Sequence, residues 1–392
     1  MGGVMEEEVV RGFLRRFLEE FPAPLGSEDP LPLSPLSRKV SLDELRGESL
    51  DLGLRLLNTR NAPSPLSAAM CHAALAKLLK ADLSPFHLPQ EAGQQQGEEQ
   101  EVVLLQSEPI QRLFLNKLQE VGVAWHQTLP APLPVGPSRF LMCSAHAIRN
   151  TRRKMEDRHV ALPDFNTLTG LKDGVERGYY AVFDGHGGVD AAVYAATHLH
   201  VTLSQQGGLQ SDPATAFKTA FTRTDDMLRG KAKREDEKQR IEDLGGCIVF
   251  MGCWRVNGTY AVSRAIGDFD QKPYVSGGAD CSSTRLHGDE DYVLLACDGF
   301  FDVVRPAEVP VLVVRALREH GESQGAVGGA GCEEVSEGVL GESVAQELVA
   351  HAKAAGSSDN ITVMVVFLRP PAHLLLQDQS NTAAAANGSA QE

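Results

Sequence analysis

The sequence of 392 residues lacks the features that mark several classes of protein. Its seven cysteines form no Cys-x-x-Cys pair, which argues against a disulfide or zinc framework and favours reduced thiols. No signal-peptide pattern opens the chain and no apolar run is long enough to cross a bilayer, so we expect no membrane partner. The formal net charge of −15 argues against a nucleic-acid-binding surface, which would be basic. These absences predict a globular protein of the cytoplasm, or of the cytoplasm and nucleus.

The first region of the chain, residues 1–136, is predicted to be helical and to contain no convincing strand. Apolar residues recur at helical spacing in three stretches: 6–21, 67–80 and 107–121. A Gln/Glu-rich stretch with glycines at 90–101 is typical of a solvated, acidic linker, and the prolines of 129–137 mark a domain boundary. The helical region could be a packing cap or a regulatory module that docks a partner protein, and the sequence leaves both interpretations open.

From residue 139 the pattern changes to short apolar strands. The predicted strands are 140–148, 178–183, 247–251, 258–263, 291–297 and 361–368. Helices are expected over 189–205 and 214–244. Because strands and helices come in groups without regular alternation, we predict an α+β domain with antiparallel sheets over 139–369. The composition of 370–392 predicts a disordered tail.

Acidic residues stand at the ends of four apolar stretches. They are Asp184, Asp298, Asp359 and the adjacent pair Glu156 and Asp157. A single acid at a strand end is usually solvated, but four of them, two followed directly by glycine, indicate a site with oxygen ligands for a hard cation. Mg²⁺ or Mn²⁺ fits this pattern, and two such ions can share a water molecule and lower its pKa. We therefore expect the Asp184 carboxylate to be one ligand and the Gly185 carbonyl another.

Five sequence segments, in order, resemble the signature segments of the metal-dependent protein phosphatases of type 2C, the PPM family. They are RRKMEDRH, VFDGHGG, WRVNGTYAVSRAIGD, CDGFFDV and SSDNITVMVVF. The resemblance covers residues 139–369, and the N-terminal extension is most similar to that of the branch of calcium/calmodulin-dependent protein kinase phosphatases. It implies a sandwich of two antiparallel β-sheets flanked by helices, with two Mg²⁺ or Mn²⁺ ions at one end between the sheets. It also implies a protein-serine/threonine phosphatase whose substrates are phosphorylated proteins, protein kinases among them.

The resemblance further implies a metal-ligand set. Asp184 would bridge the two ions, the Gly185 carbonyl would bind one of them, and Asp298 and Asp359 would hold the other. Three further acids are candidates for loop support or a weak additional metal site: Asp157, Asp268 and Asp302.

The same resemblance implies catalytic roles. Glu156 would orient a metal-bound water, and Arg152 would bind the substrate phosphate, although Arg153 beside it could exchange roles with it. An arginine suits this task because its planar fork matches a phosphoryl group. His186 would protonate the leaving serine or threonine oxygen during in-line attack by metal-bound hydroxide. A cysteine phosphatase is disfavoured, since we expect no cysteine in a phosphate-cradling Cys-x5-Arg loop.

One part of the family pattern has no counterpart. Between DGHGG and RVNGTYAVSRAIGD, the family has a further strand and a Gly-Asp-Ser turn, whereas this chain runs as if cut near 235–236. We therefore expect central strands of the sandwich to be missing. Two hypotheses remain: a working phosphatase, or a catalytically impaired splice form or pseudophosphatase that acts as a binding protein. Another carboxylate-metal hydrolase is less compatible with five ordered motifs.

Overall fold

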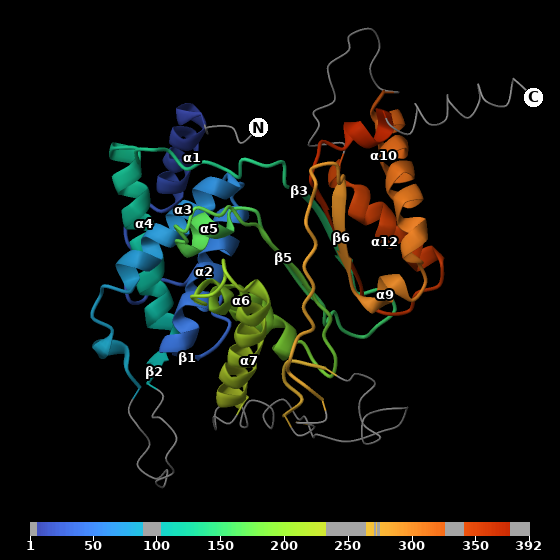
Figure 1. The fold of residues 1–392 in the computed structure, drawn as a ribbon. Coiled ribbons are helices and arrows are strands. Elements are labelled where there is room, and N and C mark those ends of the chain that lie inside the picture. Colours follow the sequence, from blue (N-terminus) through green and yellow to red (C-terminus); the bar gives the residue numbers. More distant parts are fainter. Residues whose placement is uncertain are drawn as a thin grey trace, which may run out of the picture.

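The computed structural model describes residues 6–88, 103–232, 264–269, 272, 275–325 and 341–376. In Figure 1 the helices up to residue 232, blue to yellow, gather on the left, and the orange and red elements after residue 291 lie on the right. The strands predicted at 247–251 and 258–263, the linker at 90–101 and the cut near 235–236 lie outside the described residues.

Four helices make up most of the N-terminal region. They are α1 (Glu7–Glu20), α2 (Leu42–Asn58), α3 (Ser64–Leu78) and α4 (Ser107–Gln127), with a 3-10 turn η1 (Ser84–Phe86) after α3. The first, third and fourth were predicted from apolar spacing, which places Phe13 and Phe17 of α1 in the core with Phe114 of α4. Helix α2 was not predicted, although Ser41 and Glu44 form a capping box at its start.

The prediction that this region contains no strand is wrong. Two three-residue strands, β1 (Lys39–Ser41) and β2 (Leu104–Gln106), pair in antiparallel fashion with Val40 opposite Leu105. Strands this short show no readable alternation of apolar and polar residues, so sequence periodicity could not reveal them.

The N-terminal helices pack against α5 (Phe165–Thr169) and α6 (Asp190–Ser204). Leu168 of α5 and Val201 of α6 belong to the same buried cluster as the N-terminal helices. Polar groups also meet across this junction: the Tyr194 hydroxyl donates to Glu44 at 3.1 Å, and Gly47 of α2 abuts the ring of His198. The helices therefore cap α5 and α6, as one of the two interpretations expected, while docking of a partner protein stays a prediction.

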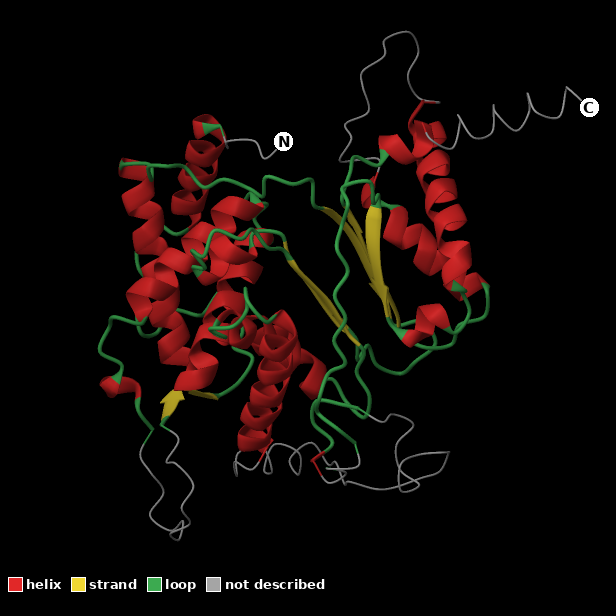
Figure 2. Ribbon diagram, viewed as in Figure 1, coloured by secondary structure: helices red, strands yellow, loops and turns green. Residues whose placement is uncertain are grey.

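The described strands after residue 139 form two antiparallel sheets. One has three strands in the order β3 (Met142–Ile148), β7 (Ile361–Phe367) and β6 (Tyr292–Ala296), and the other pairs β4 (Arg158–Leu162) with β5 (Tyr179–Phe183). Every residue of the central strand β7 is buried. Figure 2 shows β5 between the helical half and the three-stranded sheet. The predicted α+β fold with antiparallel sheets is confirmed.

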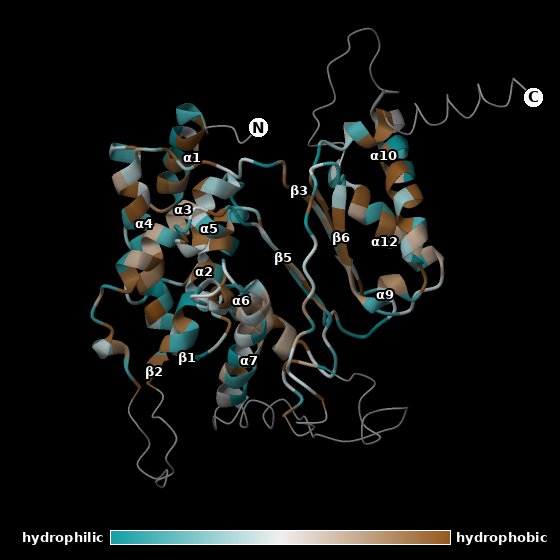
Figure 3. Cartoon of the chain, in the orientation of Figure 1, coloured by the Kyte–Doolittle hydropathy of each residue, from teal (hydrophilic) through white to brown (hydrophobic). Residues whose placement is uncertain are grey.

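Helices cover both sheets. The three-stranded sheet packs against α12 (Val344–Ala354), α10 (Val309–Gly325) and the short α9 (Asp298–Phe301), with η3 (Pro306–Glu308) leading into α10. Figure 3 shows that α10 and α12 carry apolar and polar residues on different sides. The β4–β5 pair packs against α6, and α7 (Pro213–Ala232) lies beside α6.

The described part of the chain ends in a helical turn, and it contains no membrane-spanning helix. Residues 372–376 form a helical turn and Ala372 packs against the core, so order continues into the predicted tail, whose remainder lies outside the described residues. No described helix combines the length and the apolar character that a membrane span requires.

Candidate active site at the ends of the strands

The predicted acids come from the ends of strands in both sheets. Asp184 directly follows β5, Asp298 opens α9 just after β6, and Asp359 stands two residues before β7. Glu156 and Asp157 were expected to end a strand, but they directly precede β4, because the chain turns between β3 and β4. The charges of Asp157 and Asp298 both act on Asp184, so the structure brings these three acids together.

The glycine after each of two acids allows loops to pack closely around the site. A Cβ at Gly185 would overlap the backbone carbonyl of Glu156, and one at Gly299 would overlap that of Asn360. Since both obstacles are backbone atoms, a side chain at either position would force the loops apart. The recurrent Asp-Gly pattern is therefore a packing requirement of the site as well as a turn signal.

Asp184 lies in an unfavourable electrostatic environment. Its burial among neighbouring groups raises its pKa to about 7, and the negative charges of Asp298 and Asp157 add to this rise. The residue still reaches solvent, which leaves its carboxylate accessible to an ion. Clustered carboxylates that raise one another's pKa are the donor set that a divalent cation stabilises. These residues therefore fit Mg²⁺ or Mn²⁺.

Asp157 is the most deeply placed of the acids. It is 3% exposed and accepts a hydrogen bond of 2.6 Å from the Thr362 hydroxyl on β7. This bond ties the start of β4 to the central strand of the other sheet. The structure thus gives Asp157 a supporting position, whichever role it has toward a metal.

Asp359 forms an ion pair with Arg152. The predicted metal ligand and the predicted phosphate-binding group thus contact each other directly. Among the residues that the structure describes, one trio of potential ligands has all its ligand atoms within 4.8 Å of one another, namely His287, Asp289 and Glu290 on an exposed loop. The predicted ligands do not meet this criterion as a set.

His186 pairs with Asp268. Its Nε2 lies 2.8 Å from Asp268 Oδ2, and this hydrogen bond raises the pKa of His186, with the charges of Asp268 and Asp184 adding to the rise and burial opposing it. A raised pKa favours the protonated ring, which a proton donor requires. Asp268 was a candidate for loop support or metal binding, and the structure places it on His186.

Asn360 is a site residue that sequence reasoning missed. It is 5% exposed, accepts the backbone N–H of Glu156 at 2.7 Å, and donates to the carbonyls of Arg149 at 2.9 Å and Lys154 at 3.0 Å. These bonds fasten the loop 149–156, which carries Arg152 and Glu156, to the start of β7. The signal was the amide directly after Asp359, a residue type that can bond to several backbone groups at once.

Two other candidate residues do not belong to the group of Asp157, Asp184 and Asp298. Asp302 is exposed one turn after Asp298, and its backbone N–H donates to the Asp298 carbonyl at 2.8 Å. Cys143 does precede Arg149 with Cys-x5-Arg spacing, but the intervening residues are strand β3 rather than a loop. Burial raises the Cys143 pKa to about 11, so its thiol is not a reactive nucleophile.

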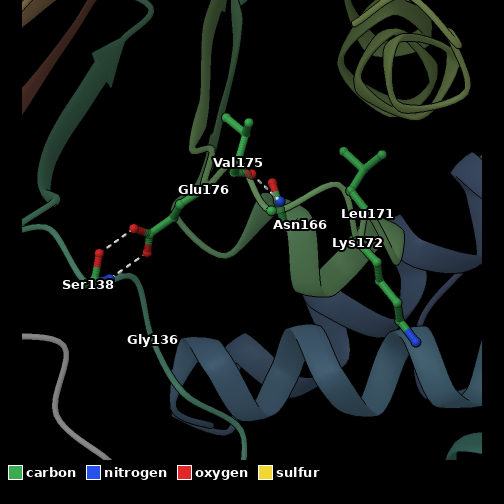
Figure 4. Close-up of a pocket in the computed structure, with 8 residues that line it drawn as sticks. Gly136, Ser138, Asn166, Leu171, Lys172, Val175 and Glu176 are labelled. Atoms are coloured by element: carbon green, nitrogen blue, oxygen red, sulfur yellow. Dashed lines mark hydrogen bonds between the residues drawn. The ribbon is translucent and has the colours of Figure 1, made fainter. Parts of the chain in front are cut away.

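A shallow surface hollow lies away from the predicted site. Figure 4 shows it beside Ser138, whose backbone N–H and hydroxyl both donate to the Glu176 carboxylate, and beside Asn166 and Lys172. None of the predicted ligands or catalytic residues lines this hollow.

Comparison with known proteins gives consistent matches. The family model described as Protein phosphatase 2C matches residues 141–235 and 229–361. Protein phosphatase 1F of Homo sapiens is 46% identical over 423 residues, which cover 94% of this chain and 89% of that protein. Protein phosphatase 1E of Homo sapiens is 43% identical over 389 residues, covering 87% of this chain and 48% of that protein.

A solved structure supports the fold. The structure of a C. elegans sex-determining protein matches with a TM-score of 0.59 and 18% identity, covering 94% of this chain and 96% of that one. This likeness concerns the fold alone, whereas the sequence matches confirm the resemblance to the type 2C phosphatases and, within them, to the calcium/calmodulin-dependent protein kinase phosphatase branch. The chain belongs to the protein phosphatase 2C family.

Proposed function

We propose that this protein phosphatase hydrolyses phosphoserine and phosphothreonine in proteins with the help of two Mg²⁺ or Mn²⁺ ions. The observation that carries the proposal is the convergence of Asp157, Asp184 and Asp298 from three strand ends, with the pKa of Asp184 raised by its neighbours. Such an arrangement costs stability unless a cation occupies it. Packing alone therefore does not account for three acids at this position.

The residues that would hold the ions are Asp184, the Gly185 carbonyl, Asp298 and Asp359. When bound, the ions would neutralise charge on the phosphate and activate the water that attacks phosphorus. Glu156 would orient that water from a loop that Asn360 holds in place. Binding would also give Asp359 a second positive partner, which would release Arg152 from its present ion pair.

Arg152 would then bind the phosphate oxygens in a bidentate manner, with Arg153 as its exposed neighbour. As the bond between phosphorus and the serine or threonine oxygen breaks, His186 would donate its proton to that oxygen. Asp268 holds the ring of His186 during this transfer. No covalent bond between the enzyme and the phosphoryl group is required.

We further propose that protein kinases are among the substrates, because the chain groups with protein phosphatases 1F and 1E and resembles the kinase phosphatase branch. The scattered cysteines support a location in the cytoplasm, or in the cytoplasm and nucleus. The N-terminal helices would have room for a partner protein on the faces turned away from α5 and α6.

Titration calorimetry with Mn²⁺ tests the metal site without requiring activity. Asp184→Ala and Asp298→Ala should abolish binding, whereas Asp289→Ala, in the exposed trio, should leave it unchanged. Unchanged affinity in the first two variants would remove the two-metal proposal. Hydrolysis of a phosphothreonine peptide that depends on Mn²⁺ and is lost in the same two variants would establish the activity.

A second candidate function is that of a binding protein with impaired catalysis. Two observations favour it: the family model matches in two pieces that meet at 229–235, and the alignment to protein phosphatase 1F runs over 423 residues, more than this chain contains. The relative therefore has segments without a counterpart here. Loss of interior strands would leave apolar faces unpacked and backbone groups unpaired.

One comparison decides between an active phosphatase and a binding protein with impaired catalysis. It sets this chain beside a version in which the segment near 235–236 is restored. We expect the chain as it stands to melt at a lower temperature and to turn over phosphopeptide more slowly. Equal melting temperatures and equal rates would show that the segment is dispensable and would exclude the impaired form.

A further inference from the structure

Asp225, on α7, is a buried acid that the proposed chemistry does not use. It is 5% exposed, and its Oδ1 accepts the backbone N–H of Gly267 at 2.7 Å. Its Oδ2 lies 3.3 Å from Lys272 Nζ and 3.8 Å from Arg229. A buried carboxylate needs such partners, and these partners come mostly from a segment some forty residues further along the chain.

The described residues of the segment that Asp225 contacts also bond to one another. The N–H of Ala265 donates to the Ser276 carbonyl at 3.0 Å, and Lys272 Nζ donates to the Ala265 carbonyl at 2.7 Å. Gly267 and Asp268 both have positive φ, +90° and +49°, a left-handed conformation that few residues with a side chain adopt, although aspartate does so more often than most. The contact from Asp225 to the Gly267 amide adds an anchor from outside the segment next to Asp268.

These contacts place Asp268 beside His186. Its Oδ2 lies 2.8 Å from His186 Nε2, and its side chain is only 15% exposed. Enzymes that move a proton with a histidine commonly orient the ring with a third group, because a misplaced ring transfers poorly. The chain of contacts therefore runs from α7 through Gly267 and Asp268 to the imidazole.

We propose that Asp225 is a positioning residue that, through the backbone of Gly267, holds Asp268 on His186. The expected effect of Asp225 on catalysis rests on the proposed function of His186 as the proton donor. The contacts from Asp225 to His186 do not depend on that function. The link also gives α7 a role in the site, although no residue of α7 is among the predicted ligands or catalytic residues.

Hydrogen exchange measured by mass spectrometry on the full chain tests the first contact. Asp225→Ala should make the Gly267 amide exchange about tenfold faster or more, because its buried acceptor is lost. Asp225→Asn, which keeps an acceptor oxygen, should preserve the protection, and Asp226→Ala, at the exposed neighbouring position, should have no effect. Unchanged exchange of Gly267 in Asp225→Ala would overturn the proposal. Amides of β3 serve as the internal reference for global unfolding.

Acylation of His186 by diethyl pyrocarbonate tests whether Asp225 keeps Asp268 in contact with His186. Like hydrogen exchange, this test does not require enzyme activity. The rate, followed by mass spectrometry, should rise in Asp268→Ala and rise in the same direction in Asp225→Ala, and Asp225→Asn should restore the slow rate. A rise in Asp268→Ala alone would show that Asp225 does not act on His186 and would overturn the proposal.

A kinetic measurement tests the catalytic consequence in the version with the restored segment. Asp225→Ala should slow cleavage of a phosphoserine peptide by about ten- to a hundredfold and slow an aryl phosphate much less, because an aryl leaving group needs no proton. Equal losses on both substrates would reduce Asp225 to a structural residue. If no variant hydrolyses either substrate, the proposed function fails while the exchange and acylation results still decide the contact.

Discussion

Replacing Asp298 by asparagine should stabilise the metal-free protein and weaken its response to metal, two effects of opposite sign. The reason is that the negative charge of Asp298 helps to raise the pKa of Asp184 to about 7. Asparagine keeps an oxygen that can accept a hydrogen bond but removes the repulsion. A residue selected for metal binding commonly destabilises the empty site, so the substitution exchanges function for stability.

The magnitude follows from Coulomb's law and the exposure of the pair. Two unit charges at about 4 Å interact by about 4 kcal/mol at an effective dielectric of 20. Because Asp184 and Asp298 both reach solvent, screening reduces this repulsion to about 1 kcal/mol. The folded pKa of Asp184 lies above its ordinary value of 3.8, so this group lowers the free energy of unfolding as pH rises from about 4 to about 7. The advantage of Asp298→Asn should therefore be full above pH 7 and fade below it.

Urea unfolding in EDTA at pH 8 and pH 5, followed by circular dichroism, measures this effect. Asp302→Asn is the matched control, since it removes the same charge one turn away. With Mn²⁺ added, the wild-type protein should gain stability and Asp298→Asn should gain much less. If Asp298→Asn lowers the free energy of unfolding in EDTA at pH 8, the reasoning about repulsion between the two acids is refuted.

Three further predictions concern packing. Gly185→Ala should abolish Mn²⁺ binding seen by calorimetry, because its Cβ would overlap the backbone of a neighbouring loop, whereas Gly207→Ala, with open space around it, should bind normally. Asn360→Ala should lower the free energy of unfolding by about 3 kcal/mol in urea titrations, about 1 for each of its three hydrogen bonds; a loss below 0.5 would contradict this account. Gly47→Ala should lower the melting temperature by closing the space that α6 occupies, while Gly12→Ala, on an open helix face, should raise it slightly; equal shifts would argue against tight packing at that junction.

The sequence allowed good prediction where the pattern is local. The apolar runs of β3, β5, β6 and β7 were predicted within two residues of their observed ends, and with them the places of Asp184, Asp298 and Asp359. The acids were grouped because they recur at the ends of apolar stretches and because Asp184 and Asp298 are each followed directly by glycine. Helix α2 escaped because its buried face includes Glu44 and Glu48, whose charges obscure the apolar spacing.

Contacts between distant segments could not be predicted. The ion pair of Arg152 with Asp359 joins residues 207 positions apart, and the bond from Asp225 to Gly267 joins an acid on a helix to a backbone group in a loop. Neither pairing leaves a periodic trace in the sequence. Such contacts follow from the placement of whole elements, which depends on the sum of many weak packing terms.

The central position of β7 also bears on how the protein is made. Because β3 and β6 pair with β7 and not with each other, these two strands have no shared partner until the ribosome has synthesised residues 361–367. The N-terminal helices, which pack on one another and on α5 and α6, find these partners before residue 205 and can fold well before then, since domains commonly fold in order of synthesis. Asp359 and Asn360 emerge at the same late moment as β7. Nascent chains would therefore carry a folded helical cap and an unassembled catalytic half, so chaperones would meet unpaired β3 over a long stretch of synthesis and unpaired β6 over a shorter, later one.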